Sequence, residues 1–244
     1  MTDAELARAI ADEAGALLLA LAEEGEHEGH ALGDAGDREA NALILERLHA
    51  ARPEDAILSE ERECNGVRLS ARRVWIVDPL DGTREYRERR ADWAVHVALA
   101  IDGVATEGAV ALPRLGLTLA TDRPPTLAPA NVPLRVVVSR TRPPAQALAV
   151  AQALGAELVP MGSAGAKAMA VVRGEADIYL HAGGQYEWDN CAPAAVARAA
   201  GLHVSRIDGS PLVYNQPDPS LPDLLVCRVE LAERVLALVR RTQS

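Results

Sequence analysis

The sequence predicts a layered α/β protein whose two halves are built differently. Up to about residue 120, two long helical patterns precede short, closely spaced strand patterns, which indicates helices packed on an antiparallel sheet. Beyond residue 133, strand and helix patterns alternate, as is typical of an α/β layer. A proline-rich stretch, Thr121 to Pro133, lies between them and indicates a linker. We therefore predict two domains, residues 1–132 and residues 133–244.

The first half begins with two helical patterns. Residues 3–24 carry apolar side chains at helical spacing, and Thr2 followed by Glu5 is a plausible capping box. The polar, glycine-punctuated stretch Glu24–His30 is expected to be a mobile loop. A second helix is predicted from about Asp37 to Ala51, ending before Pro53.

Short β-branched and aliphatic runs mark the expected strands, and alanine-rich periodic runs mark the remaining helices. Asp102-Gly103 separates two of the strands and predicts a hairpin. The strands expected in the first half are 56–58, 74–77, 94–101 and 105–112. The second half is expected to contain strands 134–139, 157–161, 176–181 and 224–227 and helices 143–154, 164–173, 189–200 and 230–241.

Composition and charge narrow the function classes. Apolar residues make up 49% and charged residues 25% of the 244 residues, the balance of a globular protein. No apolar run is long enough to cross a membrane, and the N-terminus lacks a secretory pattern, so we expect a cytoplasmic protein. A net charge of −10 argues against nucleic acid polymers but not against a small anionic substrate, because bound cations can reverse the local field. Cys64, Cys191 and Cys227 are expected to be reduced thiols.

Acidic residues gather at three points where a strand ends or a helix begins. Glu60 follows the strand at 56–58, Asp78 and Asp81 follow an apolar strand, and Asp189 opens an alanine-rich helix. Carboxylates on rigid elements can meet in one crevice, and Mg²⁺ prefers such oxygen ligands. The pattern indicates a metal site. The alternative interpretation is a set of solvated surface acids.

The segment Asp78-Pro79-Leu80-Asp81-Gly82-Thr83 carries the most information. Proline restricts the backbone between the two acids, so both side chains and the carbonyl of Leu80 can face one point. Gly82 and Thr83 begin a turn whose backbone N–H groups are available to a phosphate. A metal site and a phosphate site are thus predicted side by side. On the residues alone, a solvated turn remains an alternative.

Three motifs together resemble the inositol monophosphatase superfamily over nearly the whole chain. They are Glu-Glu upstream, Asp-Pro-Leu-Asp-Gly-Thr after an apolar strand, and Trp-Asp-x-x-Ala-x-x-Ala downstream. The resemblance implies the fold of that family, a layered αβαβα sandwich. The continuation Arg84-Glu85-Tyr86 resembles the CysQ-type 3′(2′),5′-bisphosphate nucleotidases, in particular their actinobacterial members, whereas inositol monophosphatases usually have Asn at the position of Glu85.

The resemblance implies a catalytic centre with two to three Mg²⁺ ions. One ion would bind Glu60, Asp78 and the carbonyl of Leu80. A second would bind Asp78, Asp81 and Asp189, and a third, weaker ion would lie by Glu60 and the attacking water. Two metals about 4 Å apart can activate water and stabilise the leaving oxygen, so no covalent nucleophile is required.

The resemblance also assigns the residues around the water and the substrate. Thr83 and Asp37 would orient or deprotonate the water. The family usually has Thr or Ser shortly before that Asp, which this sequence lacks, so Asp34 is an alternative. Substrate contacts are expected from Gly82, Thr83, Arg84, Ser139, Arg140, Ser163 and Lys167, with Arg142 a further arginine for a second phosphate.

The leading hypothesis is therefore a Mg²⁺-dependent phosphomonoesterase linked to sulfate assimilation. It would remove the 3′-phosphate of adenosine 3′,5′-bisphosphate, and also act on the sulfated relative, 3′-phosphoadenylyl sulfate. Lithium inhibition and a homodimer are further expectations from the resemblance. The alternatives are an inositol monophosphatase or a fructose-1,6-bisphosphatase on the same metal core, and a non-catalytic metal- or nucleotide-binding regulator.

Overall fold

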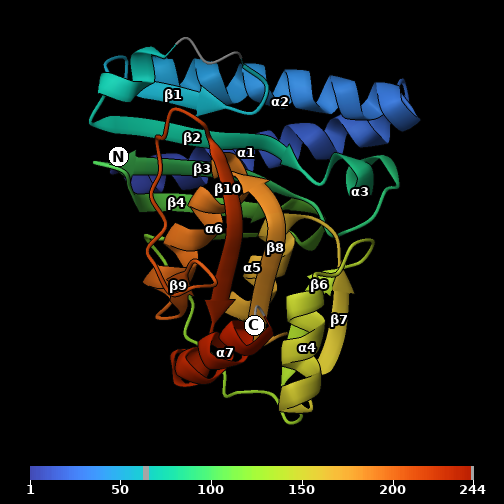
Figure 1. Cartoon of the computed structure of the whole chain (residues 1–244). Helices are drawn as coiled ribbons and strands as arrows, with labels where there is room; N and C mark the ends of the chain where they lie inside the picture. Colours follow the sequence, from blue (N-terminus) through green and yellow to red (C-terminus); the bar gives the residue numbers. More distant parts are fainter. Residues whose placement is uncertain (63–65, 243–244) are drawn as a thin grey trace.

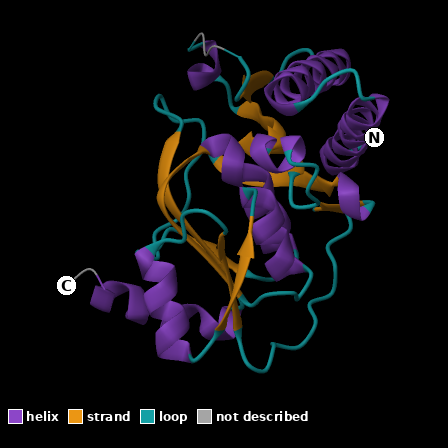
Figure 2. Ribbon diagram, turned by 90° about the vertical axis from the view of Figure 1, so that its right-hand side faces the viewer, coloured by secondary structure: helices purple, strands orange, loops and turns teal. Residues whose placement is uncertain are grey.

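The computed structural model describes residues 1–62 and 66–242 and stacks helices and sheets in alternating layers (Figure 1). The first layer contains α1 (Asp3–Glu24) and α2 (Gly29–Ala51). A sheet follows, then α5 (Ala164–Val172) and α6 (Glu187–Ala199), then a second sheet. The last layer contains α4 (Ala145–Leu154) and α7 (Val229–Thr242), and Figure 2 shows the first and last layers at opposite ends. The predicted αβαβα sandwich is confirmed.

The first sheet has five strands in the order β1-β2-β3-β4-β5. β1 and β2 are parallel, and the other neighbours are antiparallel, as the hairpin at Asp102-Gly103 predicted for β3 and β4. A five-residue helix, α3 (Thr83–Arg87), follows β2 directly. The strand bounds are β1 (Ala56–Ser59), β2 (Arg73–Asp81), β3 (Ala94–Ile101), β4 (Val104–Leu112) and β5 (Leu117–Ala120).

The second sheet also has five strands, in the order β7-β6-β8-β10-β9. β6 runs parallel to both β7 and β8, whereas β10 is antiparallel to β8 and β9. The predicted alternation of strand and helix is confirmed, although this sheet is mixed. The strand bounds are β6 (Arg135–Ser139), β7 (Glu157–Met161), β8 (Ile178–Tyr186), β9 (His203–Ser205) and β10 (Ser220–Cys227).

A β-bulge interrupts β2 at its acidic end. Asp78 pairs with His96 and Asp81 pairs with Ala94, so Pro79 and Leu80 together lie opposite Val95 alone. Side chains alternate along a regular strand, and two residues three apart would point to opposite faces. The extra residue of the bulge restores Asp81 to the face of Asp78, and a proline is tolerated at such an interruption of the ladder.

Apolar side chains form three clusters that follow the layers. One lies between the first sheet and α1 with α2, one surrounds α5 and α6 between the sheets, and one lies beneath α4 and α7. The middle cluster joins residues of both halves, for example Val74 with Val171 and Leu224. The division into domains 1–132 and 133–244 stays a prediction.

The second helix starts earlier than predicted. α2 begins at Gly29, so Asp37 lies in its interior and does not begin it, and the expected loop at 24–30 is shorter. Glycines disfavour a helix locally, but tertiary packing overrides that preference here. A Cβ on Gly33 would come within 2.8 Å of Thr83, and one on Gly36 within 3.0 Å of Tyr86. Both glycines therefore let the helix pack closely on α3 and β2.

The other predicted helices are close to their expected bounds, whereas β2 and β8 extend four and five residues beyond their predicted ends and β10 begins four residues early. The capping box of Thr2 and Glu5 is confirmed, and residues 121–134 form an irregular connection. The short elements α3, β5 and β9 were not predicted. Cys191 and Cys227 are buried free thiols, whereas Cys64 is outside the described residues. Among the described residues, no helix is long and apolar enough to cross a membrane.

Candidate active site

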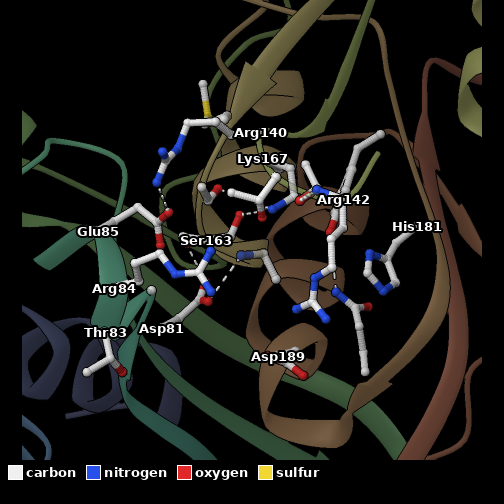
Figure 3. Close-up of a pocket in the computed structure, with 18 of the residues that line it drawn as sticks. Asp81, Thr83, Arg84, Glu85, Arg140, Arg142, Ser163, Lys167, His181 and Asp189 are labelled. Atoms are coloured by element: carbon white, nitrogen blue, oxygen red, sulfur yellow. Dashed lines mark hydrogen bonds and ion pairs between the residues drawn. The ribbon is translucent and has the colours of Figure 1, made fainter. Parts of the chain in front are cut away.

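A cavity of about 410 Å³ opens between the acidic end of β2 and the second half of the chain (Figure 3). Thr83, Arg84 and Glu85 lie on one side of it, and Arg142 and His181 lie on the other. Two of the predicted metal ligands, Asp81 and Asp189, line the cavity. All the predicted substrate contacts also line it, namely Gly82, Thr83, Arg84, Ser139, Arg140, Ser163 and Lys167.

Three carboxylates converge at what we call the inner end of this cavity, where Asp81 and Asp189 line it and the buried Asp78 lies close to both. Asp78, Asp81 and Asp189 each offer an oxygen, and these oxygens lie within 4.8 Å of one another. The bulge of β2 provides the first two, and the first turn of α6 provides the third. Asp189 also accepts a hydrogen bond from the backbone N–H of Tyr186 at 2.6 Å, which fixes it on the helix start. The structure therefore brings these three side chains together, as the sequence predicted.

The convergence is electrostatically unfavourable without a cation. Burial and the charges of Glu60, Asp81 and Asp189 raise the pKa of Asp78 well above its ordinary value. Burial and the charge of Asp81 raise the pKa of Asp189 to about 6. Buried carboxylates are normally paired or bind a metal. A set of hard oxygen donors at this spacing fits a divalent cation.

Glu60, which directly follows β1, is an exposed residue whose side chain reaches Asp78, but it lies outside the cluster of three carboxylates. Desolvation and the charge of Asp189 raise the pKa of Glu60 to about 7, and its side chain shares a hydrogen bond with Asp78. The carbonyl of Leu80 accepts a hydrogen bond from the hydroxyl of Thr83 at 3.3 Å. The amide of Leu80 donates to Asp78 Oδ1 at 3.0 Å, which shapes the turn between the two aspartates.

Asp81 is anchored on its far side by the first turn of α5. The hydroxyl of Ser163 and the N–H of Gly165, the latter at 2.6 Å, both donate to Oδ2. The N–H of Ala164 donates to Oδ1 at 3.1 Å. Burial alone would raise the pKa of Asp81, but His96 and these donors outweigh it and lower the pKa to about 2. Asp81 therefore ionises more readily than its neighbours Asp78 and Asp189, whose pKa values are raised.

His96 is a member of this group that sequence reasoning missed. It lies fully buried on β3, with Nε2 3.2 Å from Asp81 Oδ2 and Nδ1 2.9 Å from the carbonyl of Trp188. Burial alone would lower the pKa of His96, but the contacts with Asp81 and Trp188 outweigh it and raise the pKa. A single histidine within the apolar run Ala94–Ile101 was the available signal.

The predicted water-activating residues come from α2 and α3. Asp37 is half-buried, whereas Asp34 is exposed. Burial and the charges of Glu61 and Glu60 raise the pKa of Asp37 to about 7. Thr83 is packed against Gly33 of the same helix. Of the two candidates on α2, Asp37 is therefore the more buried, and the choice between it and Asp34 stays a prediction.

Several predicted substrate residues already have protein partners. The ammonium of Lys167 is buried and donates to the carbonyls of Gly162, at 3.2 Å, and Ser163. Its Nζ lies 5.5 Å from the centre of the Tyr179 ring, and burial lowers its pKa. Ser163 caps α5 and binds Asp81, and the hydroxyl of Ser139 accepts from the N–H of Arg142 at 3.2 Å.

Arg140 is held by two glutamates. Its guanidinium contacts Glu85 at 2.9 Å and Glu88 at 3.0 Å. Glu85 is buried against Gly162, where a Cβ would come within 2.3 Å of its side chain. The residue expected to discriminate between substrates therefore ties the loop after β6 to α3. In the described part of the chain, Arg84 and Arg142 have no ion-pair partner, so they are the arginines available to a ligand.

Comparisons with known proteins agree with this arrangement. The model of the inositol monophosphatase family matches residues 3–244. A Mycobacterium leprae protein named 3′-phosphoadenosine 5′-phosphate phosphatase is 53% identical, over 98% of this chain and 94% of its own length. Escherichia coli 3′(2′),5′-bisphosphate nucleotidase CysQ is 32% identical, over 74% and 78%. The crystal structure of CysQ from Bacteroides thetaiotaomicron superposes with a TM-score of 0.78 at 27% identity, over 93% and 97%.

Proposed function

The chain belongs to the inositol monophosphatase family, and on that premise we propose that it is a Mg²⁺-dependent phosphatase for adenosine 3′,5′-bisphosphate. It would remove the 3′-phosphate, act also on 3′-phosphoadenylyl sulfate, and serve sulfate assimilation. The observation that carries the proposal is the carboxylate group of Asp78, Asp81 and Asp189 at the inner end of a cavity with two available arginines. The names of the mycobacterial and enterobacterial relatives support the nucleotide substrate.

Two to three Mg²⁺ ions fit the donor set. Glu60, Asp78 and the carbonyl of Leu80 would hold one, and Asp78, Asp81 and Asp189 a second, with a third beside Glu60. When bound, the metal would lower the pKa of a water molecule and stabilise the leaving oxygen. Burial and mutual repulsion raise the pKa values of these acids, and a bound cation would stabilise their ionised forms.

The side chains around the centre would do the remaining chemistry. Asp37, with a pKa of about 7, can accept a proton from the attacking water near neutral pH, and Thr83 would orient that water. The N–H groups of Gly82 and Thr83 would hold the phosphate, since the first turn of a helix leaves its N–H groups without helical partners. Arg84 and Arg142 would bind the second phosphate, and Lys167 and Ser139 would border the nucleotide.

A substrate comparison tests this proposal. We expect phosphate release from adenosine 3′,5′-bisphosphate to exceed that from inositol monophosphate and fructose 1,6-bisphosphate in kcat/KM. It should require Mg²⁺ and be inhibited by lithium. Asp81→Asn serves as the inactive control. Faster turnover of inositol monophosphate would reverse the order of the hypotheses, and full activity of Asp81→Asn would favour a non-catalytic binding protein.

Two further expectations remain predictions. A homodimer can be tested by sedimentation of the purified chain. A cytoplasmic location can be tested by fractionation of the cells that produce it.

A further inference from the structure

The imidazole of His96 lies where three elements of the candidate centre meet. It projects from β3 towards Asp81 at the end of β2, Gly165 in the first turn of α5 and Trp188 in the first turn of α6. A Cβ on Gly165 would lie 2.0 Å from Nε2, so the ring rests directly on the backbone of α5. These three elements carry Asp81, Ser163 and Asp189.

Both ring nitrogens face hydrogen-bond acceptors. The carbonyl of Trp188 can only accept, so Nδ1, at 2.9 Å, carries a proton. Nε2 faces Asp81 Oδ2 at 3.2 Å and has no well-directed hydrogen bond to any described residue. With Nδ1 bonded to the carbonyl of Trp188, the ring is oriented so that Nε2 rests against the carboxylate of Asp81.

A buried histidine often has only a packing role, but two features distinguish this one. Its neighbours on β3 are aliphatic, and fully burying an imidazole costs free energy unless both nitrogens are satisfied. The position opposite the ring is a glycine of α5, which leaves the path from Nε2 to Asp81 open. An aliphatic side chain would satisfy packing at this place without facing either acceptor.

We propose that His96 is a positioning residue that holds Asp81 and Asp189 at the spacing required to bind a divalent cation. It acts on Asp81 directly and on Asp189 through the carbonyl of the preceding residue, Trp188. The inference rests on the proposed metal centre, but not on the nucleotide substrate. His96 and the first turn of α5 together contact Oδ2 of Asp81, whereas Oδ1 accepts a single bond, at 3.1 Å from the N–H of Ala164.

The two contacts can be separated by substitution. The amide nitrogen of glutamine can take the place of Nε2, so His96→Gln keeps a donor towards Asp81 and loses the one towards Trp188. The amide nitrogen of asparagine can take the place of Nδ1, so His96→Asn keeps the bond to Trp188 and loses the one to Asp81. His96→Leu removes both. His203→Gln, on β9 with its ring against Ser205, is the matched control.

Binding of Mn²⁺ to the metal-free proteins, followed by electron paramagnetic resonance without substrate, is the decisive measurement. Outer partners of metal ligands typically contribute 10–100-fold to affinity, so we expect His96→Leu to bind Mn²⁺ about 10–100-fold more weakly. His96→Gln should lose less affinity than His96→Asn, and His203→Gln should bind like the wild type. In activity assays, excess Mg²⁺ should restore kcat of His96→Gln while KM for the substrate stays unchanged.

Other outcomes would separate the inference from its premise. Wild-type protein that binds no Mn²⁺ would remove the metal centre itself. Wild-type affinity in His96→Leu, with native circular dichroism, would overturn the role of His96 and leave the proposed function intact. If the leucine variant does not fold, Gly165→Ala provides a second test, because its methyl group must displace the retained imidazole. Unchanged Mn²⁺ affinity in that variant would equally contradict the proposal.

Discussion

The two ends of the cavity differ in how their charges are partnered. At the inner end, acids crowd together, and among the described residues His96 is the one basic side chain paired with them. At the outer end, Arg140 already has two glutamate partners, whereas Arg84 and Arg142 have none within the described chain. The inner end thus offers oxygen ligands to a cation, and the outer end offers two arginines to an anionic ligand. A small molecule with two phosphates and bound metal would complement both.

The largest effect should come from the inner end, through Asp37. A general base typically contributes about 10²–10⁴-fold to a rate, so Asp37→Asn should lower kcat by about that factor with KM little changed. Asp34→Asn, one helical turn earlier and exposed, is the control and should stay near wild type. Steady-state kinetics at saturating Mg²⁺ measures both, and the reverse pattern would transfer the role to Asp34.

The ion pair between Arg140 and Glu85 at the outer end should matter for stability. Arg140→Ala leaves Glu85 buried without its partner, which should lower the free energy of unfolding by about 1–3 kcal/mol. Arg135→Ala removes an exposed pair with Glu157 at 3.5 Å and should cost no more than about 1 kcal/mol. Urea unfolding distinguishes them. Equal losses would mean that Glu85 is solvated after the loop moves.

The outer end should affect substrate affinity alone. Arg142→Ala should raise KM for adenosine 3′,5′-bisphosphate about 10-fold, because loss of one charge-assisted hydrogen bond to phosphate is worth roughly 1.4 kcal/mol. It should leave KM for adenosine 3′-monophosphate nearly unchanged. Arg123→Ala, an exposed arginine distant from the cavity, is the control. An equal rise of KM for both nucleotides would remove Arg142 from the second-phosphate site.

The smallest expected effect is a pH dependence of stability in metal-free protein. Folding raises the pKa values of Asp37 and Glu60 to about 7 and of Asp189 to about 6, so the folded state holds these protons more tightly than the unfolded one. Stability should therefore fall as pH rises from about 4 to 7. Asp81, with its lowered pKa of about 2, contributes the opposite term, which is lost only in stronger acid.

Thermal unfolding in chelator can measure this trend. We expect Tm to fall between pH 5 and 8, by roughly 2–4 °C for each kcal/mol of stability lost in a chain of this size. Added Mg²⁺ should raise Tm more at pH 8 than at pH 5, because it neutralises acids that are ionised only at the higher pH. A flat profile in chelator would show that the acids do not repel one another as the geometry implies.

Residue spacing predicted much of the fold and part of the site. The periodic runs of α1, β3 and α4 to α7 were recognisable because each follows a single pattern. The start of α2 was not, because Gly33 and Gly36 are unfavourable locally and are explained only by their contacts with Thr83 and Tyr86. Long-range packing determines whether such segments are helical, and it cannot be inferred from the local sequence pattern.

The site shows the same limit. Asp78, Asp81 and Asp189 could be nominated from their motifs, but nothing in the spacing showed that Asp81 takes its donors from α5. Arg140 was expected to bind substrate, and its pairing with Glu85 could not be foreseen, because it joins α3 to a loop 55 residues further along the chain. His96 was missed because a histidine in an apolar strand looks like a packing residue until its neighbours are known.

The bulge at Pro79 and Leu80 has a consequence for how this chain can change over evolution. Loss of a single residue there would reverse which face of the sheet each following side chain points to. Asp81 would then point away from Asp78, towards the α1 and α2 layer. Point substitutions can change the residues at the outer end of the cavity one at a time. The irregular segment at 121–134 can accept insertions. At the end of β2, by contrast, an insertion or deletion of one residue would separate the two aspartates, so the number of residues there must be preserved for the site to persist.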